Sequence, residues 1–156
     1  MHALEPEEDA VSLAMTRSER EAFLADLHVG VLSVQEDRHG PLTVPIWYSY
    51  APGGTVNIIT GAGTRKAQRI AAAGRFSLCA QTETPPYRYV SVEGPVVATD
   101  SPVDPDERRD LAYRYLGQEF GDLYLQATAA RDASSVAIRM QPASWLTTDF
   151  TKEFGS

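Results

Sequence analysis

Apolar and polar residues alternate along several short stretches of the chain, and this pattern predicts β-strands. In the stretch LTVPIWYSY, every second residue from Leu42 to Tyr50 is apolar or aromatic. Comparable strand-like runs lie at 29–35, 55–60, 76–81, 87–99 and 135–141. Residues 144–148 are expected to continue the last of these strands beyond Pro142. About six strands at meander spacing predict a mainly β fold with short α-helices, built as a six-stranded antiparallel barrel.

Helical periodicity replaces alternation in four other stretches, at 16–27, 64–74, 104–117 and 119–131. The ends of two of these helices are marked by residues that favour helix termini. Thr64 is the expected N-cap of the second helix, and Gly74 is expected to stop it. Asp104 caps the third helix with Pro105 at its first position, and Gly117 ends it. The chain is therefore expected to insert short helices between its strands.

The bulk composition fits one globular domain. A chain of 156 residues that is 43% hydrophobic and 22% charged can bury a full core. We expect residues 16–156 to form a single domain. The acidic residues 1–15 lack an apolar run and are expected to form a flexible tail rather than a signal peptide. No run of eighteen apolar residues is present, so we expect no membrane partner.

Charge and cysteine content narrow the class of function. A net charge of -7 argues against general nucleic-acid binding, which needs a basic face. The single cysteine, Cys79, excludes an intrachain disulfide and makes the cytoplasm the expected compartment. Its place on an alternating strand predicts a buried, inert thiol. His2, His28 and His39 are scattered, so no metal site is expected.

A cluster of positive charge at the start of the second helix is the first candidate for a binding site. The segment TGAGTRKAQRI, at 60–70, places Arg65, Lys66 and Arg69 within one and a half helical turns. A helix start offers free N–H groups and the positive end of the dipole, so basic residues there predict a phosphate cradle. The alternative is a solvated basic helix face, which is the commoner origin of such a pattern.

A second candidate is the proline-aromatic pair within the strand at 42–50. Pro45 removes a donor from the strand ladder, and Trp47 follows on the same face. This combination predicts a flat apolar surface for a ring system, with an edge strand carrying an exposed tryptophan as the alternative. Gln81, at the end of another strand, carries an amide that can donate to and accept from a heterocycle. Tyr113, Tyr115 and Tyr124 are expected to be packing residues.

These features occur in an order that resembles the flavin-binding split-barrel family, whose best-known member is pyridoxamine 5'-phosphate oxidase. The segments that carry the resemblance are VGVLSVQ, VPIWYSYAPGGTVNIITGAGTRKAQRIAAAGRFSLCAQ and YRYVSVEGPVV. They match a family pattern of a strand with proline and an aromatic residue, a hairpin, a strand ending in Thr, a basic helix start with Lys, and strands ending in Gln and in Val-Glu-Gly. The resemblance covers residues 16–148 and is strongest to the bacterial branch that includes deazaflavin (coenzyme F-420) dependent oxidoreductases. It implies a split barrel of the FMN-binding type.

The resemblance also implies a homodimer with two cofactor sites at the subunit interface. Arg65 and Lys66 would hold the cofactor phosphate, assisted by Thr60 and Thr64. The ring of the cofactor would lie against the segment made of Val44, Pro45, Ile46, Trp47 and Tyr48. Gln81 would approach the ring or its ribityl chain, and Trp145 of the partner subunit would close the pocket.

The function that follows is an oxidoreductase in which F-420 or FMN passes hydride to a small conjugated organic substrate. No residue is assigned as catalytic, and the proton is expected from solvent or from Tyr48. Additional basic residues, Arg69, Arg75 and Arg88, are expected to favour the acidic tail of F-420. No basic residue is placed to recognise pyridoxamine phosphate, so the true oxidase activity is not expected. The alternative function is a carrier that binds flavin or F-420 without turnover.

Overall fold

The computed structural model describes residues 12–155. Most of the predicted tail at 1–15 therefore lies outside the described residues. From Leu13 onward the chain runs beside the last strand, because the N–H of Asp149 donates to the Leu13 carbonyl at 2.7 Å. The N–H of Met15 donates to the hydroxyl of Thr147 at 2.9 Å, and Met15 itself is buried.

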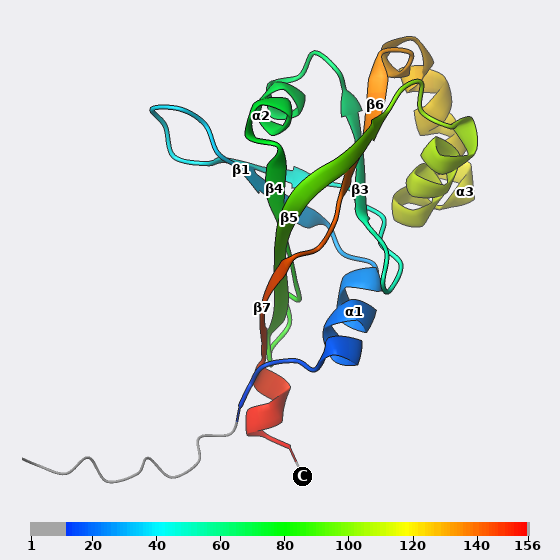
Figure 1. The fold of residues 1–156 in the computed structure, drawn as a ribbon. Helices are drawn as coiled ribbons and strands as arrows, with labels where there is room; N and C mark the ends of the chain where they lie inside the picture. Colours follow the sequence, from blue (N-terminus) through cyan, green and yellow to red (C-terminus); the bar gives the residue numbers. More distant parts are fainter. Residues whose placement is uncertain (1–11, 156) are drawn as a thin grey trace, which may run out of the picture.

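An antiparallel sheet of seven strands forms the body of the protein (Figure 1). The strands are β1 (Gly30–Val34), β2 (Leu42–Ile46), β3 (Val56–Gly61), β4 (Arg75–Gln81), β5 (Arg88–Asp100), β6 (Ser135–Met140) and β7 (Ser144–Asp149). Their order is β2-β1-β4-β5-β6-β3, and β7 pairs with β5. The sheet curls into a half-barrel, which confirms the expected mainly β split barrel. The strands exceed the expected six because residues 144–149 form a strand of their own.

Three α-helices and a short 3-10 helix complete the fold: α1 (Arg17–Ala25), α2 (Arg65–Ala73), α3 (Pro105–Asp132) and η1 (Phe150–Glu153). Helix α2 has Thr64 as its N-cap and Gly74, at φ 72°, as its C-cap, as predicted. Helix α3 is interrupted at Gly117, where φ is 78°, and its two arms correspond to the two helices expected on either side of that glycine. Figure 1 shows both arms on the side of the barrel formed by β3 and β6.

The hydrophobic core lies inside the curled sheet, because alternate residues of each strand point inward. The inward-facing residues of β1, β3, β4 and β5 include Leu32, Ile58, Leu78 and Val90, all with no exposed surface. Helix α1 adds Leu24 to this core. In the run from Leu42 to Tyr50, the apolar face of the predicted alternation is the buried one, because Ile46, Tyr48 and Tyr50 belong to the core.

Strand β5 is long enough to join the two halves of the barrel. It pairs along its first half with β4 and β7, and along its second half with β6. The chain leaving β6 crosses over β5 at Gly94 to begin β7. At this crossing the N–H of Gln141 donates to the Pro95 carbonyl, and the N–H of Ala143 donates to the Glu93 carbonyl, each at 2.9 Å.

Candidate functional site

A cavity of about 650 Å³ opens between the sheet and α3. Its walls come from the end of β2, the end of β3, the start of α2, both arms of α3 and the start of β6. The lining residues are Val29, Pro45, Ile46, Trp47, Ile59, Thr60, Gly61, Gly63, Thr64, Lys66, Arg108, Leu111, Ala112, Tyr124, Arg131, Asp132, Ser134 and Ser135. Its volume lies within the usual range for cofactor and substrate sites. Six of the ten predicted site residues meet in this one cavity.

The start of α2 forms the polar end of the cavity. The hydroxyl of Thr64 accepts the N–H of Ala67 at 3.3 Å and donates to the carbonyl of Gly61 at 2.8 Å. The hydroxyl of Thr60 lies 3.1 Å from that of Thr64. A helix start leaves its first N–H groups without intrahelical acceptors, and no acidic residue lies in this first turn. Donors and the positive helix end therefore face the cavity together.

Lys66 is the cation of α2 that lines the cavity. Within the described residues it forms no ion pair, so its ammonium group is available to a ligand. Thr60, Thr64 and Lys66 are thus brought together in one cavity. Their combination of hydroxyls, free amides and a cation matches what a phosphate group requires.

Arg65 lies outside this cavity and is already bound to a carboxylate. Its Nε donates to Oε2 of Glu36 at 2.8 Å, and its Nη2 bonds Oε1 of the same residue. The Nε of Arg69 lies 3.7 Å from Oε2 of Glu36, whose side chain is only 6% exposed. The hydrogen bond from Arg65 holds the pKa of the Glu36 carboxyl below its ordinary range. A phosphate would therefore compete with Glu36 for Arg65.

The end of β2 forms the apolar wall. Pro45, Ile46 and Trp47 line the cavity, whereas Val44 packs against the core and does not line it. Tyr48 is fully buried, and its hydroxyl donates to the Leu24 carbonyl at 2.7 Å. Burial raises the pKa of Tyr48 well above its ordinary value. Its hydroxyl is therefore unavailable as a proton donor to a molecule in the cavity.

Two further predicted residues lie elsewhere. Gln81 is exposed at the far end of β4, in a separate hollow of about 320 Å³ lined by the loop that leads to β5. Trp145 on β7 packs edge-on against Tyr50 at 6.2 Å, and the Arg20 guanidinium lies over its ring at 4.6 Å. Within one chain, neither Gln81 nor Trp145 reaches the cavity.

Helix α3 supplies a polar wall that was not predicted from the sequence. Nη1 of Arg108 lies 2.9 Å from Oδ1 of Asp132, and the hydroxyl of Thr128 donates to Oδ2 of Asp132 at 2.6 Å. Arg108 thus joins the two arms of α3 and also faces the cavity. Arg131 lines the same wall and forms no ion pair within residues 12–155. The sequence signal for this wall was Gly117, which predicted that the helix divides into two arms. It did not indicate that Arg108 and Asp132 would meet.

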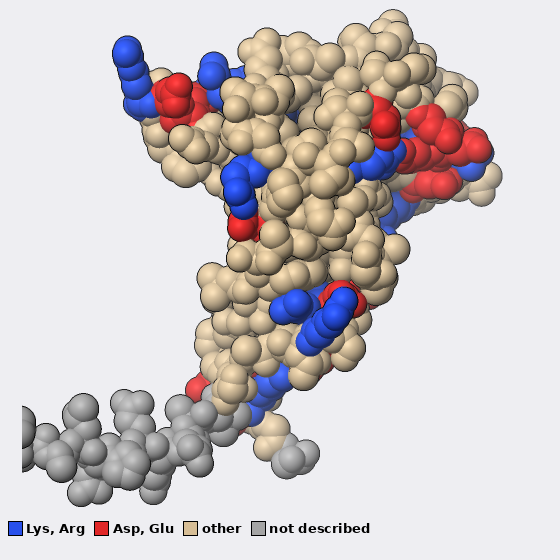
Figure 2. Space-filling model, viewed as in Figure 1, with Lys and Arg blue, Asp and Glu red and all other residues tan. Residues whose placement is uncertain are grey.

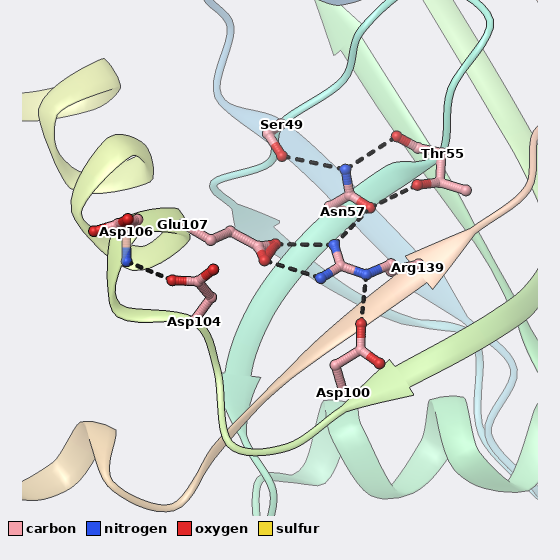
Figure 3. A network of polar contacts seen from close by, with 8 residues as sticks. All are labelled: Ser49, Thr55, Asn57, Asp100, Asp104, Asp106, Glu107 and Arg139. Carbon is pink, nitrogen blue, oxygen red and sulfur yellow. Dashed lines mark hydrogen bonds and ion pairs between the residues drawn. The ribbon is translucent and has the colours of Figure 1, made fainter.

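The first arm of α3 is fixed to the sheet by Arg139 of β6 (Figure 3). Nη1 and Nη2 of Arg139 donate to the two carboxylate oxygens of Glu107, each at 2.9 Å. Its Nε donates to Asp100 at 2.7 Å, and Nη1 also reaches Asn57 at 3.1 Å. This network lies beyond the cavity and holds the wall that carries Arg108.

The charge distribution and the available metal ligands limit which ligands the described part of the chain can bind. A group of acidic residues covers the first arm of α3, and a smaller group lies by the turn between β1 and β2 (Figure 2). Among residues 12–155, no cluster of His, Cys, Asp and Glu could hold a metal ion. The described helices are all too short or too polar to cross a bilayer.

Comparison with known families identifies the class of protein. The family model for pyridoxamine 5'-phosphate oxidase matches residues 16–149. The chain belongs to this family, and the resemblance in its sequence motifs is confirmed. No curated protein sequence matches the chain.

Solved structures share the fold at low sequence identity. The conserved hypothetical protein Rv2991 from Mycobacterium tuberculosis has a TM-score of 0.72 at 19% identity, over 96% of this chain and 94% of that one. A protein described as an F420 reductase has a TM-score of 0.58 at 20% identity, over 81% and 94% of the two chains. A FAD-binding protein from Mesorhizobium loti has a TM-score of 0.62 at 18% identity, over 86% and 94%. These proteins are similar to this chain in fold, a flavin-binding split barrel.

Proposed function

We propose that this protein is an oxidoreductase that uses a flavin-type cofactor to transfer hydride to a small conjugated substrate. One observation carries the proposal. The free start of α2, with Lys66, and the apolar wall at Pro45 and Trp47 line the same cavity. A phosphate end and a flat ring end are the two parts that such a cofactor presents. When bound, the cofactor supplies the hydride chemistry, and the protein supplies binding and orientation.

The residues of the cavity divide this task between them. Lys66 and the first amides of α2 bind the phosphate, with the hydroxyls of Thr60 and Thr64 beside them. Pro45 and Trp47 offer a rigid surface to the ring. Arg65 is a weaker candidate because Glu36 already holds its guanidinium.

We favour F-420 over FMN as the cofactor. Of the basic residues first expected to bind its acidic tail, Arg69 lies near Glu36 and Arg75 pairs with Glu93. Arg88 lies over the Phe23 ring and lines the separate hollow beside Gln81. Arg131 lines the cavity and forms no ion pair within residues 12–155, so it offers positive charge there, whereas Arg108 lines the cavity but is paired with Asp132. FMN, with one phosphate, would leave Arg131 unused. The structural neighbours include both an F420 reductase and a FAD-binding protein, so the choice depends on the charge in the cavity.

The proton for the reaction is assigned to solvent. Tyr48 is buried and bonded to a main-chain carbonyl. The carboxylate that lines the cavity, Asp132, is bound on both oxygens by Arg108 and Thr128. This lack of a free acid in the described cavity walls is also the observation that favours the alternative function, a carrier of flavin or F-420 without turnover.

The protein is further proposed to be a cytoplasmic homodimer. The exposed face of the sheet carries a broad area with few charges around β5 (Figure 2), and Val97 and Leu146 are 57% and 65% exposed. A partner covering this area could bring its own Gln81 or Trp145 to the cavity. Size-exclusion chromatography with light scattering tests the dimer, and a monomer at micromolar concentration would contradict it.

The cofactor site is tested by titrating F-420 and FMN into the wild-type chain and three variants. Lys66→Ala is expected to weaken binding by about 10- to 100-fold, because a charge-assisted hydrogen bond to phosphate is lost. Arg65→Ala is expected to have a smaller effect. Arg17→Ala removes the same charge from a side chain that is 80% exposed on α1, and serves as the control. Equal affinities in Lys66→Ala and the control would reject the phosphate site.

Turnover separates the enzyme from the carrier. The reduced cofactor is mixed with the protein and a panel of quinones and enones, and its reoxidation is followed by absorbance. Repeated turnover supports the oxidoreductase. Stoichiometric binding without reoxidation across the panel supports the carrier.

A further inference from the structure

The ring of Trp47 is held in one orientation by tyrosines of α3. Tyr115 stacks on Trp47 with ring centroids 5.0 Å apart and an interplanar angle of 3°. Tyr124, from the other arm of α3, lies 5.3 Å away at 52°. Trp47 therefore contacts both arms of the helix while it lines the cavity. Such aromatic contacts restrict the ring more than apolar burial alone.

The main chain around Trp47 needs this support because it leaves the sheet there. Strand β2 ends at Ile46, and the ladder resumes only at Ser49, which exchanges two hydrogen bonds of 3.0 Å with Asn57. Between these points the N–H of Tyr48 donates to the hydroxyl of Tyr115 at 3.1 Å. A side chain of α3 thus replaces the missing strand partner.

The same hydroxyl reaches a second segment of main chain. Tyr115 donates to the carbonyl of His28 at 2.7 Å, on the connection between α1 and β1. The neighbouring Arg114 donates to the carbonyls of Ala25 at 3.0 Å and Asp26 at 2.7 Å. The first arm of α3 is therefore fixed to two main-chain segments at the edge of the cavity.

From these contacts we infer that Tyr115 is the positioning residue for the ring-binding wall of the cavity. Its ring fixes the plane of Trp47, and its hydroxyl fixes the main chain that carries Trp47. Tyr115 does not itself line the cavity, so it acts on a ligand through Trp47. This inference rests on the proposed function, because it assigns the orientation of the wall on which the cofactor ring lies.

The experiment uses the full chain with Trp145→Phe. The sequence has two tryptophans, so Trp47 is the only one left in this variant. Acrylamide quenching of Trp47 fluorescence is measured in this background for Tyr115→Leu, which removes stacking and hydroxyl, and for Tyr115→Phe, which keeps the ring. Tyr113→Phe is the matched control, because its hydroxyl bonds Asp122 on the same helix and its ring does not touch Trp47. Circular dichroism confirms that each variant is folded.

The quenching constant is expected to rise by about twofold or more in Tyr115→Leu, since the stacked ring shields one face of the indole. Tyr115→Phe should restore most of the shielding, and the control should match the parent. If Tyr115→Leu and Tyr115→Phe both match the control, the positioning role is wrong. This readout needs no ligand and so remains decisive even if the proposed function fails.

The second readout is the affinity for F-420 and FMN with Trp145 intact. Tyr115→Phe is expected to weaken binding by about three- to tenfold, the loss associated with one or two hydrogen bonds, while Tyr113→Phe leaves it unchanged. If Tyr115→Phe and Tyr113→Phe bind the cofactors with equal affinity, the proposed effect of Tyr115 on the ligand is wrong. Failure of the wild type to bind either cofactor would reject the proposed function and leave the quenching result to decide the role of Tyr115.

Discussion

Replacing Gly94 by alanine is expected to disturb the crossing that divides the barrel into two halves. A Cβ at this position would lie 1.8 Å from the Gln141 carbonyl oxygen and 3.1 Å from the Ala143 nitrogen. Both are main-chain atoms, so no side-chain rotation can relieve the contact. The segment that connects β6 to β7 must therefore move away. The two hydrogen bonds that join this segment to β5 must lengthen or break.

The expected loss in the free energy of unfolding follows from these contacts. Two main-chain hydrogen bonds contribute roughly 1–3 kcal/mol together, and forcing an extra carbon into a packed site costs about 1–3 kcal/mol. We therefore expect Gly94→Ala to lower the free energy of unfolding by roughly 2–6 kcal/mol, a large share of the stability of a domain of this size.

Urea denaturation followed by circular dichroism measures this change. Gly40→Ala is the control, because a Cβ there would have no neighbour within 4 Å. The denaturation midpoint should fall for Gly94→Ala and stay within error for Gly40→Ala. If Gly94→Ala is destabilised by less than about 1 kcal/mol, the close approach of the two chain segments at Gly94 is wrong.

Three other substitutions test the contacts around the site. Arg65 lowers the pKa of Glu36, so the carboxylate stabilises the fold above its ordinary pKa and this contribution is lost as pH falls through the lowered value. Glu36→Gln should therefore flatten the acid side of the melting-temperature curve, and an unchanged curve would refute the pairing. Tyr48→Phe leaves a buried carbonyl of α1 unpaired and should cost about 1–2 kcal/mol in urea denaturation; wild-type stability would contradict this. Arg139→Met removes both bonds to Glu107 and should speed hydrogen exchange in the first arm of α3, whereas unchanged exchange would show that the network does not hold that arm.

Local signals allowed much of the fold to be predicted from the sequence. The bounds of α2 follow from Thr64 and Gly74, and the break in α3 follows from Gly117, because capping and positive φ depend on adjacent residues. The alternating pattern also identified the core face of the run from Leu42 to Tyr50. Thr60 and Lys66 meet Trp47 in one cavity, as the order of motifs implied.

Contacts between distant segments could not be predicted in the same way. Glu36 binds Arg65 because the turn after β1 folds against α2, and neither residue carries a sign of the other in the sequence. Tyr115 was expected only to pack, whereas its ring and hydroxyl hold Trp47 and Tyr48. Each of these contacts depends on how complete elements dock, which periodicity does not encode.

Strand β7 shows the same limit at the level of topology. Residues 144–148 were expected to continue the strand before them, yet they pair with the first half of β5. The change of sheet takes place at Gly94, where the chain passes close over β5. Gly94 is the glycine of the Val-Glu-Gly motif that carries the family resemblance, and this close approach is a physical reason for a glycine there.

We propose that the cavity beside α2 binds a flavin-type cofactor through its phosphate. Equilibrium titration of the wild-type chain with F-420, and in parallel with FMN, tests it most directly. We predict saturable binding of about one equivalent per chain, tighter for F-420, that weakens as salt rises because the phosphate contact is electrostatic. The absence of saturable binding of either cofactor would contradict the claim.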